Sequence, residues 1–148
     1  MAGNKRRRND APDAPEFRAS HRYAKISPRK ARLVMDAIRD LPVSRALDQL
    51  RHMPQRGAAL IDKVLKSAIA NADRAIEDER VRDAGGVTIE PQPAVDVDDL
   101  YVHDARVDEG PRLKRWMPRA RGSAYPYRKF YSHLVIGLRP RASAGREG

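Results

Sequence analysis

The fold is decided by one stretch of the sequence, Gly110-Pro111-Arg112-Leu113-Lys114-Arg115-Trp116-Met117-Pro118-Arg119-Ala120-Arg121-Gly122-Ser123-Ala124-Tyr125-Pro126-Tyr127-Arg128-Lys129-Phe130. It carries seven Arg or Lys residues and neither Asp nor Glu, so no carboxylate within it neutralises its charge. Pro118 and Gly122 mark a turn at its centre, and strand-like runs flank it at 100–107 and 130–138. Two strands joined through central turn residues predict an extended β-hairpin.

The chemistry of this stretch favours a nucleic acid as partner. Each neutralised phosphate releases condensed counterions, and aromatic rings and guanidinium groups stack on bases. The alternative is a solvated basic loop without a partner. Two strands at the ends of the stretch argue against that alternative, because a disordered loop rarely needs ordered arms.

Composition and charge narrow the class of protein further. The 148 residues fit one domain with a modest core, and the net charge of +10 favours a polyanionic partner. The absence of cysteine excludes disulfides and thiolate catalysis. No apolar run approaches the roughly 18 residues of a membrane span, and no signal-peptide core follows the basic start. We therefore expect a cytosolic protein without a membrane partner.

The charge is unevenly distributed along the chain. Residues 1–72 hold 16 basic and 7 acidic side chains, residues 73–109 hold 4 and 12, and residues 110–148 hold 10 and 1. One acidic block separates two basic ones. We expect the folded protein to turn one side to the polyanion and the other to water or a basic neighbour.

The segment before the first helix predicts a short strand. It spans 17–26 and places four alternating side chains on one side, namely Phe17, Ala19, His21 and Tyr23.

Ser27-Pro28 predicts the start of a helix, with Ser27 as N-cap and Pro28 at the first helical position. Three cations in or next to its first turn oppose the helix macrodipole, which is unfavourable unless an outside anion compensates. These cations, Arg29, Lys30 and Arg32, therefore form a second candidate contact surface. The expected apolar stripe consists of Ala31, Leu33, Val34 and Ile38.

Two more helices follow. The first is expected to begin with Ser44 as N-cap, to turn Ala46, Leu47 and Leu50 inward, and to end at Met53-Pro54. The second is expected from Pro54 to about Ile76, because apolar residues recur at helical spacing and predict a core-facing side. These residues are Leu60, Ile61, Val64, Leu65, Ala68, Ile69 and Ala72.

The remaining segments complete the predicted organisation. We expect a flexible basic tail at 1–16, a single domain at 17–139 and a flexible tail at 140–148. Within the domain, we expect residues 77–97 to form an acidic surface loop, called the acidic excursion below, and residues 109–130 to form the hairpin. In the excursion a solvated loop is favoured over a metal site, because the carboxylates lack Ca²⁺-loop spacing.

The sequence contains little that indicates an enzyme. The four histidines are widely spaced, and no phosphate loop, nucleophile elbow or paired-carboxylate motif occurs. His133 fits either a buried hydrogen-bonded residue or an RNA contact better than a catalyst. A metal-dependent nuclease would need carboxylates beside the basic surface, but acids and bases are segregated in sequence. We expect no enzymatic activity, no cofactor, no metal and no small-molecule substrate.

Several motifs, taken in order, resemble the large-subunit ribosomal protein L22 family (uL22) of bacterial type. They are His21-Arg22-Tyr23-Ala24-Lys25-Ile26-Ser27-Pro28-Arg29-Lys30-Ala31-Arg32-Leu33-Val34, Lys63-Val64-Leu65-Lys66-Ser67-Ala68-Ile69-Ala70-Asn71-Ala72, Val107-Asp108-Glu109-Gly110-Pro111, Leu113-Lys114-Arg115, Met117-Pro118-Arg119-Ala120-Arg121-Gly122 and Ser132-His133-Leu134. The resemblance runs from about His21 to Leu138.

This resemblance implies an α+β fold, in which a three-stranded antiparallel sheet packs with three helices and a long β-hairpin protrudes. It also implies a structural protein of the large ribosomal subunit, in the cytoplasm, that binds 23S rRNA during assembly. The hairpin would line the nascent-peptide exit tunnel, so the expected partners are 23S rRNA, neighbouring large-subunit proteins and the nascent peptide. The alternative is a free RNA- or DNA-binding protein, with a nuclease as a distant third.

The expected site follows from the cations, the rings and the resemblance together. RNA contacts are expected at Arg22, Lys25, Arg29, Lys30, Arg32, Arg112, Lys114, Arg115, Trp116, Arg119, Arg121, Tyr125, Tyr127, Arg128, Lys129 and His133. The resemblance implies that the tunnel is lined by Met117, Pro118, Arg119, Ala120, Arg121, Gly122, Ser123 and Ala124.

Overall fold

The computed structural model describes residues 16–84 and 99–141, side chains at 77–84 excepted. The elements, in chain order, are β1 (Phe17–Ala24), α1 (Pro28–Ile38), α2 (Val43–His52), α3 (Arg56–Ala84), β2 (Leu100–Pro118), the short 3₁₀ helix η2 (Ala120–Gly122) and β3 (Ala124–Pro140). Three helices and a three-stranded antiparallel sheet confirm the predicted α+β fold.

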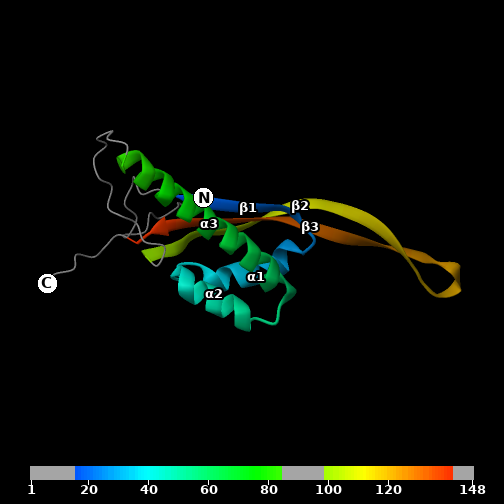
Figure 1. The fold of residues 1–148 in the computed structure, drawn as a ribbon. Helices are drawn as coiled ribbons and strands as arrows, with labels where there is room; N and C mark the ends of the chain where they lie inside the picture. Colours follow the sequence, from blue (N-terminus) through cyan, green and yellow to red (C-terminus); the bar gives the residue numbers. More distant parts are fainter. Residues whose placement is uncertain (1–15, 85–98, 142–148) are drawn as a thin grey trace, which may run out of the picture.

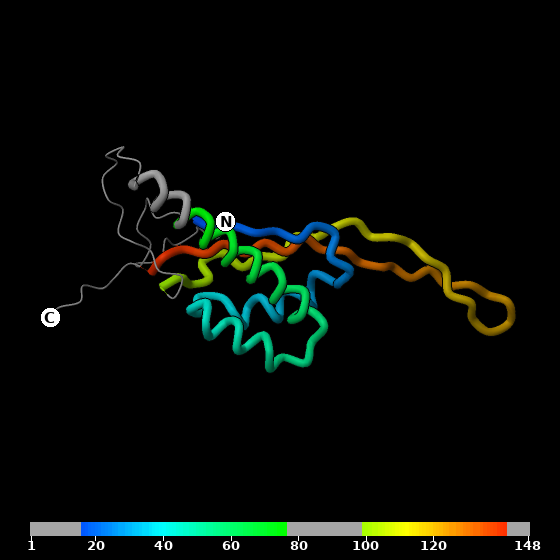
Figure 2. Tube along the Cα trace, in the orientation of Figure 1, coloured from blue at the N-terminus to red at the C-terminus, as the bar shows by residue number. Residues whose placement is uncertain are grey.

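The sheet has the order β1-β3-β2, so the last strand in sequence is the central one. Phe17 pairs with Leu138 at one edge, and Val107 pairs with Leu134 at the other. The helices gather around one end of the sheet, while β2 and β3 continue beyond them as a long two-stranded ribbon (Figure 1). The trace in Figure 2 shows the same division into a compact body and an arm.

The apolar stripe of α3 packs against the sheet, as its periodicity predicts. Ile61, Leu65, Ala68 and Ala72 are fully buried, and they share one core with the buried side chains of α1, α2 and all three strands. On β3 the core takes Leu134, Ile136 and Leu138, which alternate along the strand. This core anchors the end of the hairpin nearest the body.

The predicted stripe of α1 was wrong at one position. Leu33 is 71% exposed, and Met35 is buried in its place beside Ala31, Val34 and Ile38. Successive residues of a helix are about 100° apart, so Leu33 lies about 200° from Ala31 and cannot share its side. Leu33 instead lies at the edge of a groove described below.

The predicted alternation of β1 fails at its end. The pairing with β3 shifts between His21 and Ala24, and Tyr23 has a positive φ of 58°. This bulge turns Ala24 inward and leaves Tyr23 59% exposed. The strand ends at Ala24 rather than at Ile26.

The start of α2 also differs from the prediction. Pro42 occupies the N-cap position and Ser44 lies within the helix. The reason is tertiary, because the connection after α1 is held against β2: Asp40 N donates to Val102 O at 3.0 Å, and Val102 N donates to Leu41 O at 2.9 Å. The helix therefore begins directly after Pro42.

The third helix is longer than predicted and continues to Ala84 rather than ending near Ile76. No Gly or Pro occurs between Ile76 and Gly85, so nothing in the local sequence ends the helix earlier. The predicted acidic excursion at 77–97 thus begins inside α3. The rest of it, and most of the predicted tails at 1–16 and 140–148, lie outside the described residues.

Candidate nucleic-acid interface

The hairpin is an antiparallel ribbon whose pairing runs from Arg112–Phe130 to Pro118–Ala124. Every side chain from Pro111 to Phe130 is exposed, except that Tyr127 is half-buried. The ribbon extends away from the helices (Figure 1). Its stability therefore cannot come from burial against the body.

Both faces of the ribbon carry cations and rings. Directly paired residues lie on the same face, and neighbours along a strand lie on opposite faces. One face holds Arg112, Lys114, Trp116, Pro126, Arg128 and Phe130, and the other holds Leu113, Arg115, Met117, Tyr125, Tyr127 and Lys129. Neither face is apolar enough to pack onto a protein core, and Lys114 directly opposes Arg128.

Two cations already lie near aromatic rings. The Cζ atom of Arg112 is 5.5 Å from the centroid of Phe130, and the Nζ atom of Lys129 is 6.0 Å from the centroid of Tyr127. By contrast, Trp116 and Tyr125 are 67% and 61% exposed. These two rings present the largest open surfaces on which a base could stack.

The tip is a tight turn that contains the predicted tunnel-lining residues. Arg119 N donates to Ser123 O at 2.8 Å, and Ser123 Oγ donates to Ala120 O at 2.8 Å. Arg121 and Gly122 both have positive φ, 59° and 69°. The bend thus rests on Gly122, as predicted, and on Arg121, while Pro118 ends β2. All residues from Met117 to Ala124 are exposed.

The base of the hairpin is fixed by a bulge and an ion pair. The pairing of β2 with β3 shifts between Glu109 and Arg112, and a side chain at Gly110 would lie 2.9 Å from the carbonyl oxygen of Tyr131. The guanidinium of Arg112 bonds the carboxylate of Glu109. The hydrogen bond from Arg112, and then its charge, lower the pKa of Glu109 below its ordinary value.

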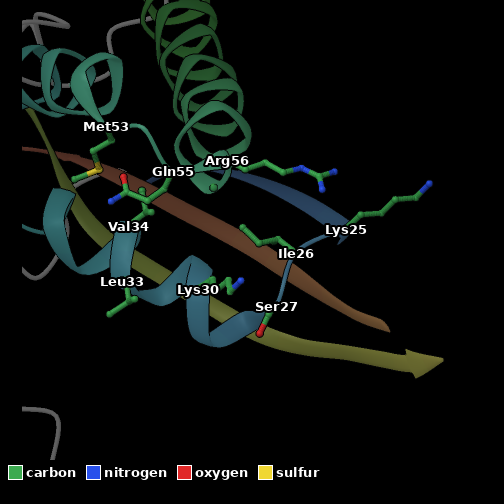
Figure 3. Close-up of a pocket in the computed structure, with 10 residues that line it drawn as sticks. Lys25, Ile26, Ser27, Lys30, Leu33, Val34, Met53, Gln55 and Arg56 are labelled. Atoms are coloured by element: carbon green, nitrogen blue, oxygen red, sulfur yellow. The ribbon is translucent and has the colours of Figure 1, made fainter. Parts of the chain in front are cut away.

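A groove in the body forms a second basic surface. It has a volume of about 490 Å³ and lies between the β1–α1 connection, α1 and the α2–α3 connection (Figure 3). It is lined by Lys25, Ile26, Ser27, Lys30, Leu33, Val34, Met53, Gln55, Arg56 and Gly57. The structure thus places Lys25 and Lys30, two of the expected RNA contacts, in one groove, and it adds Arg56 and Gln55, which the sequence analysis did not single out.

Arg29 and Arg32 lie outside this groove. Arg29 is exposed on α1, whereas Arg32 donates through Nε and a terminal nitrogen to the carbonyl oxygen of Val107, at 3.3 and 3.1 Å. Arg32 therefore links α1 to β2. An RNA contact by Arg32 would have to use its remaining donors.

Arg22 and His133 meet at the bulge of β1. The Nδ1 atom of His133 accepts a hydrogen bond from Tyr23 N at 3.1 Å, and the two rings are T-shaped with centroids 4.8 Å apart. Of the roles expected for His133, the structure shows a half-buried, hydrogen-bonded residue. Arg22 and His133 line a separate hollow of about 360 Å³ with Arg106 and Asp108.

The charges near this hollow are largely paired. Arg106 lies 3.7 Å from Asp104 and 4.0 Å from Asp108, and Glu16 binds Arg18 at 2.9 Å and Arg139 at 3.3 Å. Burial alone would raise the pKa of Glu16, but hydrogen bonds and attraction from the two arginines outweigh it and lower the pKa. This part of the sheet offers a polyanion far less uncompensated charge than the hairpin does.

Two findings concern other kinds of site. Within residues 16–84 and 99–141, no group of His, Cys, Asp or Glu is arranged to hold a metal ion. No helix in the same part of the chain is both long and apolar enough to cross a membrane.

Residues 19–139 match the family described as Ribosomal protein L22p/L17e. The chain belongs to this family. Among its relatives, the proteins named large ribosomal subunit protein uL22 from Chloroflexus aggregans and Maridesulfovibrio salexigens are each 44% identical over 121 residues. These matches cover 82% of this chain and 92% and 94% of the relatives. The counterpart from Ligilactobacillus salivarius is 44% identical over 119 residues, 80% of this chain and 89% of its own.

The part of the chain that matches the L22p/L17e family contains the whole hairpin, the groove, and every residue of the hollow at His133 except Arg18. The resemblance seen in the sequence is thereby confirmed. The L22p/L17e family is a structural, non-enzymatic component of the ribosome, which confirms the expectation that this chain is not an enzyme.

Proposed function

We propose that this protein is a structural constituent of the large subunit of the bacterial cytoplasmic ribosome, where it binds 23S rRNA and supports assembly. The relatives are named large ribosomal subunit proteins, which supports the assignment to that particle. Residues 17–139 act as one domain in this role. The rRNA contacts are divided between the hairpin, the groove and the neighbouring cations of α1.

The observation that carries RNA binding is the charge of the ribbon on both faces. Seven cations between Gly110 and Phe130 have no carboxylate among them, and Lys114 and Arg128 are opposed across the ribbon. Like charges at directly opposite positions destabilise a strand pair, so an outside anion is needed to offset their repulsion. A phosphate backbone that follows the ribbon supplies such anions on either face.

The hairpin tip is proposed to line the nascent-peptide exit tunnel. Met117 to Ala124 lie at the end of the ribbon farthest from the helices, where no part of the body can cover them (Figure 1). Ribbon cations held by rRNA would fix the tip in place, and the turn would then face the nascent peptide. Neighbouring large-subunit proteins would contact the body.

A free RNA- or DNA-binding protein would use the same cations, and sedimentation distinguishes the two roles. The tagged protein, expressed in bacterial cells, is followed through a sucrose gradient after a high-salt wash. We expect it to migrate with the large subunit at near-equal stoichiometry. Recovery of the protein only in the light fractions, with RNA binding intact in vitro, would show that it acts outside the ribosome.

A further inference from the structure

The groove of the body differs from the hairpin because it combines cations with an apolar floor. Val34 is buried, Ile26 and Met53 are half-buried, and Leu33 is 71% exposed at the edge. A surface that met only phosphates would need no such floor. A concave surface lined by apolar side chains with a few polar groups at its rim is typical of a ligand-binding site.

The charge at the rim has a single sign. Lys25, Lys30 and Arg56 line the groove, no Asp or Glu does, and no described carboxylate is within 4.0 Å of their charged nitrogens. In Figure 3, Lys25 and Arg56 extend to the same side, with Lys30 on the adjacent helix. Both α1 and α3 begin at this groove without an acid in the first turn, so their dipoles add to the positive potential.

The groove also offers a group that can recognise a polar edge. Gln55 lies beside Val34 and Met53 in Figure 3, and its amide has both donors and an acceptor. The volume of about 490 Å³ lies within the range of about 300–1,000 Å³ that small ligands occupy.

We propose that this groove holds a single unstacked RNA nucleotide. Its base would lie on the floor at Ile26 and Met53 and against Leu33 at the edge, with its polar edge against the amide of Gln55. Its flanking phosphates would bind Lys25, Lys30 and Arg56. The inference rests on the proposed function, since it takes RNA to be the partner. A base-paired duplex would bind the cations but would keep its bases away from the floor, and an acidic peptide would leave the floor uncovered.

The test uses the full chain and two single-stranded RNA octamers that differ only in one central abasic site. Both octamers have the same charge, so the hairpin and the rim cations attract them almost equally. Removing the apolar surface of a base from water against aliphatic side chains is worth on the order of a tenfold change in affinity. We therefore expect the intact octamer to bind roughly tenfold more tightly by fluorescence anisotropy, and to shift the methyl resonances of Ile26, Leu33 and Met53.

Two matched pairs of variants locate the effect in the groove. Leu33→Asn should remove the preference for the intact octamer, whereas Leu113→Asn, the same change at an exposed hairpin leucine, should keep it. Gln55→Glu should weaken binding of both octamers several-fold, because it places a negative charge in the groove that repels the phosphates bound at the rim. Gln49→Glu, the same change at an exposed position of α2 outside the groove, should not. All four positions are exposed, and unchanged thermal unfolding of each variant verifies its fold.

Equal binding of the two octamers, or a preference that Leu33→Asn leaves intact, would overturn this inference. So would displacement of the octamer from the groove methyls by a poly-glutamate peptide at equal charge concentration, since that would indicate an acidic protein partner. In each case the proposed function still stands if the protein migrates with large subunits. If the protein does not migrate with large subunits but still prefers the intact octamer, the groove binds a nucleotide and the ribosomal role is wrong.

Discussion

Arg32 donates to the carbonyl oxygen of Val107, and Arg39 donates to that of Ala105 at 2.8 Å. Both guanidinium groups thus attach α1 to β2. Arg29 and Lys30, on the same helix, are exposed, and no described carboxylate lies within 4.0 Å of their charged nitrogens. The basic residues at the start of α1 therefore divide into a structural cation and two that are available to phosphates.

This division predicts two different phenotypes. Replacing Arg29 and Lys30 together with Ala should flatten the slope of log K against log salt for an rRNA fragment by about 1.5 units, since each phosphate contact contributes about 0.7–0.9. Arg32→Ala should change the slope less and should lower the free energy of unfolding by about 1–3 kcal/mol, because it removes a charged hydrogen-bond donor. Salt titrations and urea unfolding measure the two effects. If Arg32→Ala alone flattened the slope by as much as one whole phosphate contact, the remaining donors of Arg32 would be shown to bind RNA.

Glu16 gives a pH-dependent prediction. Its pKa in the folded protein is lowered from the ordinary value of 4.5, so its stabilisation is complete above that pH and is lost as the pH falls through the folded pKa. Glu16→Gln should therefore cost about 0.5–1 kcal/mol near pH 7. The difference from the parent protein should shrink as the pH falls through the lowered pKa of Glu16. Urea unfolding at a series of pH values measures this difference. A cost that stays constant across that range would mean that the carboxylate charge is not what stabilises the fold.

At the scale of elements, the hairpin is held by hydrogen bonds between its two strands, and its side chains are not buried against the body. A two-stranded ribbon of this kind is marginally stable in water, and the pair formed by Lys114 and Arg128 weakens it further. We expect the free protein to keep a folded body while the ribbon from Gly110 to Lys129 opens frequently. Binding of rRNA should then order the ribbon. Amide exchange that is strongly protected throughout 110–129 without RNA would contradict this view.

Reversing one charge by mutation tests whether cross-strand repulsion destabilises the ribbon. Lys114→Glu places a carboxylate opposite Arg128 and should slow amide exchange in the free ribbon about two- to fivefold, as a cross-strand ion pair replaces a repulsive one. Arg115→Glu makes the same change in net charge but opposite Tyr127, so it should leave exchange almost unchanged. Both variants should bind rRNA more weakly. Equal exchange rates in the two variants would show that cross-strand repulsion does not limit the ribbon.

At the scale of the whole molecule, stability and binding are placed in different parts of the chain. The buried hydrophobic residues of the described chain end at Val107 on β2 and resume at Leu134 on β3, with only Ser132 buried between them. The hairpin thus adds nothing to the core. Conversely, most of the uncompensated cations of the described chain lie in the hairpin and the groove.

Deleting the ribbon should therefore weaken RNA binding without lowering the stability of the body. With residues 111–130 replaced by an Asn-Gly turn, the free energy of unfolding should change by less than about 0.5 kcal/mol, because no core contact is lost. The salt slope for rRNA should fall by roughly five to six units if all seven removed cations contact phosphates. Leu65→Ala is the converse control, with a cost of about 2–5 kcal/mol and an unchanged slope. Loss of cooperative unfolding on excision would mean that the ribbon is part of the folding unit.

The sequence predicted those features that depend on local pattern. The stripe of α3 and the hairpin were visible because periodicity and turn residues act over a few positions. Leu33, Tyr23 and Ser44 were misplaced because a helical phase, a bulge and a contact with β2 decided their environment. The sequence could not show that Lys25, Lys30 and Gln55 line one groove. They come from three segments that only tertiary packing brings together.

The central position of β3 has a consequence for how the protein is made. Phe17 pairs with Leu138, so β1 has no hydrogen-bonding partner until the chain has been translated beyond that residue. The helices between them leave the ribosome earlier, with apolar sides that only the finished sheet can cover. Sheet closure across so long a sequence separation is intrinsically slow. Closure of the sheet should therefore wait until β3 has been synthesised, and the helices made before it should depend on chaperones in the interval.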